Sequence, residues 1–102
     1  MDIITIEELH HRINAGEQLN LIDVREPYEH EEFNIGGHLH PLGRIMSADV
    51  DAIETLKDRE VIVYCRSGNR SGQAAMMLEA MGFIDVKNLQ GGMLAWRQQF
   101  PG

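Results

Sequence analysis

The sequence predicts an α/β fold in which helices cover both faces of a largely parallel central sheet. Short runs of β-branched and aliphatic residues alternate along the chain with segments whose apolar residues recur at helical spacing. The run at residues 19–24 is mostly apolar, as expected of a strand covered on both faces. Strands that alternate with helices in this way pair in parallel, because each crossover helix returns the chain to the same end of the sheet.

Start and stop signals place the elements of the first half of the chain. Thr5 and Glu8 fit the capping box that begins a helix, and Gly16 ends that helix. Pro27 suits the first turn of a short helix. The expected order is an edge strand at 3–4, a helix from 5 to about 14, a strand at 19–24, an acidic helix at 27–32, a brief extended piece at 38–42, and one or two short helices within 43–56.

The second half of the chain is predicted around a strand at residues 60–64. A polar loop follows this strand, and a helix then begins at about Ser71 and is capped by Gly82. Residues 84–89 form the last expected strand, and the Gly-Gly pair at 91–92 opens a final helix. Ligands bind at the carboxyl ends of parallel strands, so the ends of the strands at 19–24 and 60–64 are expected to lie side by side at a site.

The composition predicts one globular domain, residues 1–102, without repeats, low-complexity segments or linkers. A net charge of −7 repels nucleic acid and anionic membrane surfaces, so an anionic substrate requires a locally positive site. The start of the chain lacks the features of a secretion signal, and no stretch is apolar enough to span a membrane, so we expect a cytoplasmic protein. One cysteine excludes an internal disulfide, a CxxC redox pair and a cysteine-cluster metal site.

That cysteine, Cys65, lies where the strand at 60–64 ends. The loop continues through Arg66, Ser67, Gly68, Asn69 and Arg70. A loop between a strand and a helix turns backbone N–H groups inward, and the helix dipole adds positive potential there, so the loop binds anions. We interpret Cys65 as a nucleophile whose thiolate this loop and both arginines stabilise, with a pKa below about 8.5. Gly68 and Asn69 are expected to supply positive φ angles. The alternative is a buried, inert thiol.

Other polar groups have simpler interpretations. Asp23 and Arg25 are expected to form a buried or half-buried ion pair that steadies the site, rather than to act as catalytic groups. The five histidines are expected to be solvated surface residues, so no metal and no cofactor is expected. The four glutamates within 26–32 fit an exposed helix face better than a cation site. Core or loop-side packing is expected, rather than a partner groove, for Met76, Met77, Met81 and Met93.

Four segments, at residues 21–26, 34–42, 63–71 and 88–96, together carry a family resemblance over nearly the whole chain. They resemble, in order, the signatures of the single-domain rhodaneses, a sulfurtransferase family. The second segment departs from the family's usual His-Ile-Pro-Gly-Ala, because residues 34–38 read Asn-Ile-Gly-Gly-His and one residue fewer precedes Pro41. The resemblance implies a three-layer rhodanese-like fold whose central, mostly parallel sheet has five strands.

The resemblance also implies a two-step sulfur transfer. The Cys65 thiolate would attack the outer sulfur of thiosulfate or a similar donor, release sulfite and become a persulfide. An acceptor, cyanide in an assay and a thiol such as a reduced dithiol protein in the cell, would then take that sulfur. The loop amides can stabilise both the Cys65 thiolate and the persulfide anion that replaces it. Arg66 and Arg70 would draw in and orient the donor, and Arg70 would also hold the shape of the loop.

Two other functions are compatible with such a loop. Cysteine phosphatases and arsenate reductases resemble the same fold, but they need Cys-x5-Arg, whereas Cys65 and Arg70 give Cys-x4-Arg. A ring that is one residue smaller should close around sulfur and exclude phosphate. The second alternative is a persulfide carrier that passes sulfur between proteins with little turnover of free thiosulfate, and the sequence does not separate it from an enzyme.

Overall fold

The sheet forms where the chain is richest in β-branched and aliphatic residues, and the computed structural model describes it within residues 1–101. All strand pairs are parallel, in the order β1-β5-β4-β2-β3. The strands are β1 (Asp2–Ile4), β2 (Leu21–Asp23), β3 (His38–Leu39), β4 (Glu60–Tyr64) and β5 (Asp85–Leu89). The helices are α1 (Ile6–Asn14), α2 (Pro27–Glu32), α3 (Leu42–Met46), the 3-10 helix η1 (Asp51–Leu56), α4 (Asn69–Ala80) and α5 (Gly92–Gln99).

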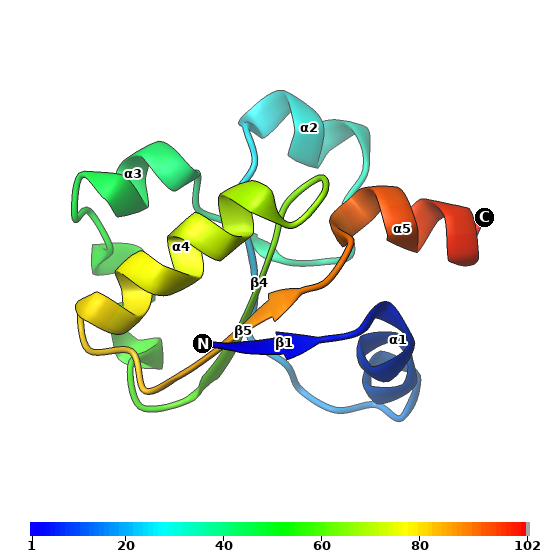
Figure 1. Cartoon of the computed structure of the whole chain (residues 1–102), viewed down its shortest axis with the longest axis horizontal. Coiled ribbons are helices and arrows are strands. Elements are labelled where there is room, and N and C mark those ends of the chain that lie inside the picture. The colour runs from blue at the N-terminus through cyan, green and yellow to red at the C-terminus, as the bar shows by residue number, and fades with distance from the viewer. Residues whose placement is uncertain (102) are drawn as a thin grey trace.

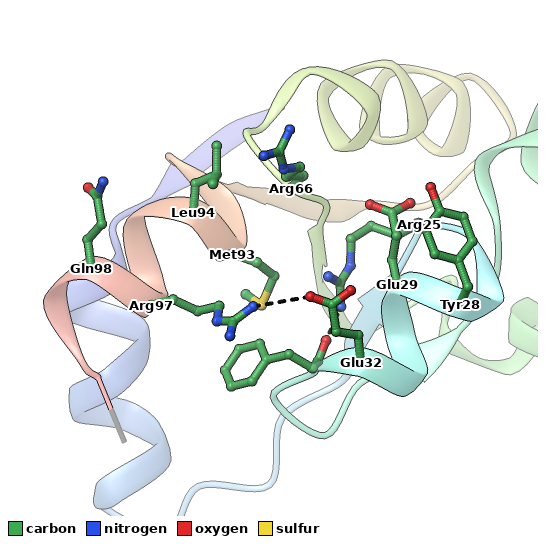
Figure 2. Close-up of a pocket in the computed structure, with 10 residues that line it drawn as sticks. Arg25, Tyr28, Glu29, Glu32, Arg66, Met93, Leu94, Arg97 and Gln98 are labelled. Carbon is green, nitrogen blue, oxygen red and sulfur yellow. Dashed lines mark hydrogen bonds and ion pairs between the residues drawn. The ribbon is translucent and has the colours of Figure 1, made fainter.

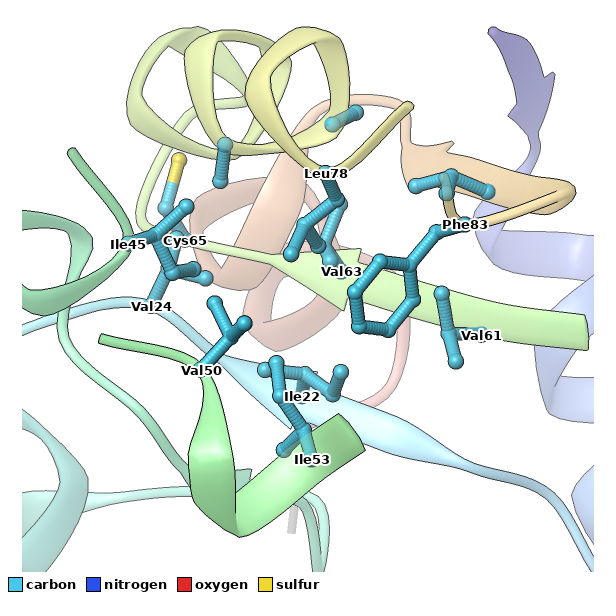
Figure 3. Packing of buried hydrophobic residues seen from close by; sticks show 13 residues of the cluster. Ile22, Val24, Ile45, Val50, Ile53, Val61, Val63, Cys65, Leu78 and Phe83 are labelled. Carbon is cyan, nitrogen blue, oxygen red and sulfur yellow. The ribbon is translucent and has the colours of Figure 1, made fainter. Parts of the chain in front are cut away.

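Strand β4 divides the apolar core into two clusters. Because successive strand residues point to opposite faces, Val61 and Val63 pack into one cluster and Ile62 and Tyr64 into the other. The first cluster lies under α3, η1 and α4, and Cys65 belongs to it (Figure 3). The second lies under α1 and α5. Figure 1 shows these helices on the two sides of the sheet, so the expected three-layer α/β fold is confirmed.

The predicted elements are all present, and the differences lie at their ends. Strand β2 is shorter than the run at 19–24, and the extended piece at 38–42 is reduced to β3 because Pro41 caps α3. Helix α4 begins at Asn69 rather than at Ser71. Gly68 caps α4 with a φ of 107°, and the expected positive φ at Asn69 is wrong, since Asn69 is already helical.

Two expectations about surface and core need correction. His40 is fully buried rather than solvated, and its ring Nε2 lies 2.7 Å from the carbonyl oxygen of Asp49. Met76 does not pack into the core, because its side chain is 66% exposed, whereas Met93 is buried in the second cluster as expected. Across residues 1–101, no helix is both long and apolar enough to cross a bilayer.

Candidate active site

The loop after β4 is held at both of its ends. Gly68 takes the left-handed conformation that lets the chain turn from the strand into α4. The amides of Met93 and Leu94, at the start of α5, donate to the carbonyls of Cys65 and Arg66, each at 2.9 Å. Gly92 permits this approach, since a Cβ on it would lie 2.5 Å from the Cys65 oxygen. The sequence indicated the Gly-Gly pair only as a helix start and gave no signal for its contact with the loop.

The Cys65 thiol is 1% exposed and faces hydrogen-bond donors. The amide of Gly68 lies 3.0 Å from Sγ, and the hydroxyl of Ser71 lies 3.3 Å from it. Burial alone raises the pKa of the Cys65 thiol, but hydrogen bonds from the Ser71 hydroxyl and from the amides of Ser71, Gly68 and Ser67 outweigh burial and lower the pKa. The environment therefore favours the thiolate, as a nucleophile requires.

Two residues that the sequence did not single out for the site complete this cluster. Ser71 and Asn88 are buried, and the Ser71 hydroxyl donates to Oδ1 of Asn88 at 2.5 Å. The Asn88 amide Nδ2 donates in turn to the carbonyl of Gly68 at 3.1 Å. Asn88 sits on β5, 17 residues from Ser71. The sequence signal for it is its place as the first residue of the segment 88–96 that carries the family resemblance.

A cavity of about 540 Å³ lies beside the loop, between α2 and α5 (Figure 2). Its walls include Arg66, Met93 and Leu94, the last two being the residues whose amides hold the loop. Arg66 is exposed, and Figure 2 shows its side chain at the loop above the cavity. The other two arginines that line the cavity have carboxylate partners: Arg97 of α5 lies 3.7 Å from Glu32 of α2, and Arg25 is paired with Asp23. Arg66 is thus the cation best placed to meet an incoming anion.

Arg70 is positioned by a partner from α2. Its two terminal nitrogens lie 2.7 and 2.9 Å from the carboxylate oxygens of Glu29. The Arg70 hydrogen bonds hold the pKa of Glu29 at about 2. The expectation that the acidic helix face is simply exposed is therefore wrong for Glu29, which is half-buried. The pairing favours the role of Arg70 in holding the loop.

The expected pair at the end of β2 is present and buried. Nε and Nη2 of Arg25 lie 2.9 and 2.8 Å from the two oxygens of Asp23. Arg25 also donates to the carbonyl of Phe33, and His30 Nδ1 lies 2.8 Å from Asp23 Oδ2. The His30 contact was not foreseen. Asp23 pairs with Tyr64 in the strand register, one residue before Cys65, so the ion pair lies next to the loop.

Comparison with known proteins identifies the family. Residues 5–99 match the family model of the Rhodanese-like domain. The chain belongs to the rhodanese-like family. This confirms the resemblance found in the sequence, and the rhodanese-like fold is shared by solved structures. The chain is similar to a rhodanese-like domain protein from Staphylococcus aureus, with a TM-score of 0.81, 32% identity, and coverage of 94% of this chain and 91% of that one. It also superimposes on a rhodanese-like domain from Anabaena with a TM-score of 0.85 and 25% identity over 98% of this chain and 76% of that one.

Several relatives have names that refer to sulfur transfer or to a sulfur carrier. A protein named Sulfurtransferase from Allochromatium vinosum is 39% identical over 91% of this chain and 85% of its own length. The probable adenylyltransferase/sulfurtransferase MoeZ of Mycobacterium tuberculosis is 39% identical over 94% of this chain, and the putative sulfur carrier protein YrkF of Bacillus subtilis is 36% identical over 91%. The chain spans only 24% of MoeZ and 49% of YrkF, so it corresponds to one part of those longer proteins.

Proposed function

We propose that the chain is a sulfurtransferase that moves sulfane sulfur from thiosulfate or a similar donor to a thiol through a persulfide on Cys65. The observation that carries this proposal is the buried Cys65 Sγ facing the Gly68 amide and the Ser71 hydroxyl. The backbone amide of Gly68 is fixed in place, so it stabilises an anion on sulfur without rearrangement when that anion forms. The sulfurtransferase names among the relatives support the same chemistry.

In the first step, the Cys65 thiolate attacks the outer sulfur of thiosulfate. A bond forms between Sγ and that sulfur, the original S–S bond breaks, and its electron pair leaves with sulfite. Arg66 stands exposed at the loop and attracts the dianionic donor. Despite the burial of Cys65, hydrogen bonds from Ser71, Gly68 and Ser67 lower its pKa, which favours the thiolate that this attack requires.

In the second step, an acceptor thiolate attacks the outer sulfur of the persulfide. The S–S bond to Sγ breaks, and its electron pair returns to Cys65 as thiolate. A reduced dithiol protein is the acceptor that we propose for the cell, and cyanide serves in an assay. Since Cys65 is the one cysteine of the chain, no second thiol within it can take the sulfur. The cytoplasmic location stays a prediction.

A persulfide carrier is the second candidate, and the relative named as a putative sulfur carrier favours keeping it. A phosphatase or arsenate reductase is disfavoured, because Cys65 and Arg70 give Cys-x4-Arg rather than the Cys-x5-Arg that those enzymes need. Both terminal nitrogens of Arg70 are also already paired with Glu29. Phosphate should therefore not protect Cys65 from alkylation, whereas protection by phosphate would revive this alternative.

The experiment is the intact mass of the protein after incubation with thiosulfate. We expect a gain of one sulfur atom in the wild type and none in Cys65→Ser. Steady-state turnover with thiosulfate and cyanide then separates an enzyme from a carrier, which would accept one sulfur but cycle slowly. A wild-type mass that stays unchanged with thiosulfate and with other sulfane donors would refute the sulfur-transfer proposal.

A further inference from the structure

A chain of hydrogen bonds leads from the Cys65 loop to β5 and ends at Asn88. Asn88 Nδ2 donates to the Gly68 carbonyl at 3.1 Å, and Asn88 Oδ1 accepts from Ser71 at 2.5 Å. A backbone carbonyl can only accept, so the Gly68 contact fixes the orientation of the Asn88 amide and turns Oδ1 toward Ser71. Asn88 is 9% exposed and Ser71 is fully buried, so water does not compete freely for these groups.

The Ser71 hydroxyl has one proton and two acceptors within reach. Asn88 Oδ1 lies at 2.5 Å and Cys65 Sγ at 3.3 Å. The shorter contact places the proton toward Asn88 while Cys65 is a thiol, and a lone pair of Ser71 then faces Sγ and can accept its S–H. When Cys65 is a thiolate, Ser71 can donate to Sγ only by leaving Asn88 Oδ1 without a donor. Asn88 and the thiolate therefore compete for the same proton.

We propose that Asn88 is a positioning residue that holds the Ser71 proton away from Cys65 Sγ during sulfur uptake and yields it when Sγ becomes the leaving group. The inference rests on the sulfur-transfer function proposed above. A thiolate with fewer hydrogen bonds is the stronger nucleophile, and one with more is the better leaving group. Asn88 therefore favours attack on the donor, and the turn of Ser71 toward Sγ assists discharge.

The persulfide left by the first step is an anion, and it takes one proton from solvent before discharge. The acceptor thiolate then forms a bond to the outer sulfur of the protonated persulfide, and the bond between that sulfur and Cys65 Sγ breaks. The electron pair of the broken bond stays on Sγ, and the proton of the persulfide leaves with the transferred sulfur. Ser71 then rotates and donates to Sγ, so no additional oxidant or reductant is needed.

The charged groups near the loop do not take part in this competition. Within residues 1–101, the side-chain hydrogen bonds of Asn88 go to Gly68 and Ser71. Helix α5 meets the loop through backbone amides. The charged groups around Cys65 are Arg66 of the loop, Arg70 of α4 with its partner Glu29 of α2, and the pair Asp23 and Arg25 at the end of β2.

The test is Asn88→Leu, which keeps the size of the side chain and removes its polar atoms. Ser71 then donates to Sγ without a competitor, so the pKa of Cys65, measured from the pH dependence of alkylation by iodoacetamide, should fall by about half a unit to one unit. The alkylation rate of the fully ionised thiolate should fall about two- to threefold. If Asn88 had a purely structural role, Asn88→Leu would instead raise the pKa of Cys65. Loss of the Asn88 hydrogen bond to the Gly68 carbonyl would loosen the loop and weaken the hydrogen bond from the Gly68 amide to Sγ. A raised or unchanged pKa would overturn the proposal.

Three further variants keep the test decisive. In a Ser71→Ala background, Asn88→Leu should leave the pKa of Cys65 unchanged, and a shift as large as in the wild-type background would refute an action through Ser71. Asn88→Asp keeps the acceptor and adds a negative charge, so it should raise the pKa. Asn88→Ala replaces Asn88→Leu, with the same expected sign, if circular dichroism shows that the leucine variant does not fold. The alkylation experiment needs no sulfur donor. Failure of the wild type to take up sulfur would therefore refute the proposed function without deciding the role of Asn88.

Discussion

Arg70 and Glu29 face each other in a two-pronged ion pair that joins the start of α4 to α2, with N–O distances of 2.7 and 2.9 Å. The pair lies beside the Cys65 loop, and the residues are 41 positions apart in the sequence. A contact of this kind ties the helix that begins at the loop to the helix that walls the neighbouring cavity. It makes the shape of the site depend on a single carboxylate of α2.

Replacing that carboxylate should weaken the fold in a pH-dependent way. We expect Glu29→Gln to lower the free energy of unfolding by about 1 kcal/mol at neutral pH, since the pair is partly exposed to water. The Arg70 hydrogen bonds hold the pKa of Glu29 at about 2, below its value of about 4.3 in an unfolded chain. The contribution of the pair is therefore present above about pH 4.3 and is lost as the pH falls through 2. Urea unfolding across this range measures it, and the exposed Glu31→Gln on the same helix is the control.

Gly92 is the position at which a methyl group should damage the site most. Gly92→Ala places a Cβ 2.5 Å from the Cys65 carbonyl at a residue with a φ of 56°, so the start of α5 must move away from the loop. We expect a loss of about 2 kcal/mol in unfolding free energy and slower alkylation of Cys65 at neutral pH. Gly43→Ala is the matched control, because nothing lies within 4 Å of its Cβ position. Equal stability of the two variants would contradict the close contact.

Arg66 should act on substrate attraction rather than on stability. Arg66→Ala should raise the KM for thiosulfate by about tenfold at low salt, since one exposed cation beside the loop is removed. The unfolding midpoint should stay unchanged. Arg44→Ala, which removes an exposed arginine of α3, is the control. A KM that rises equally in both variants would assign the effect to the net charge of the protein.

The pair at the end of β2 should matter far more for stability than an exposed pair. Asp23→Asn leaves Arg25 charged and buried without its partner, and we expect a cost of about 3 kcal/mol or more. Asp49→Asn breaks the exposed pair of Arg44 and Asp49 and should cost less than about 1 kcal/mol. Thermal unfolding of both variants compares them, and similar costs would show that Arg25 finds another partner.

The sequence predicted the fold well because the signals for strands, helices and their caps lie within a few neighbouring residues. The apolar run of β4, the polar loop and the apolar face of α4 are each readable within a few residues, and so are caps such as Thr5. Pairs between distant segments could not be predicted, because nothing near Glu29 indicates that Arg70 will meet it. The burial of His40 has the same cause, since its hydrogen-bond partner lies on the chain before η1. For Asn88 the motif was recognised, but the contact with Ser71 depends on the register of β5 with β4.

The two amides of α5 that hold the Cys65 loop also determine when the site is assembled. Met93 and Leu94 emerge from the ribosome after the loop that they bind, so the carbonyls of Cys65 and Arg66 have no such partners while residues 92–99 are still unmade. A nascent or truncated chain that stops before α5 therefore carries a thiol whose surroundings are incomplete. We therefore expect the Cys65 loop to reach its final shape only after α5 has docked against it.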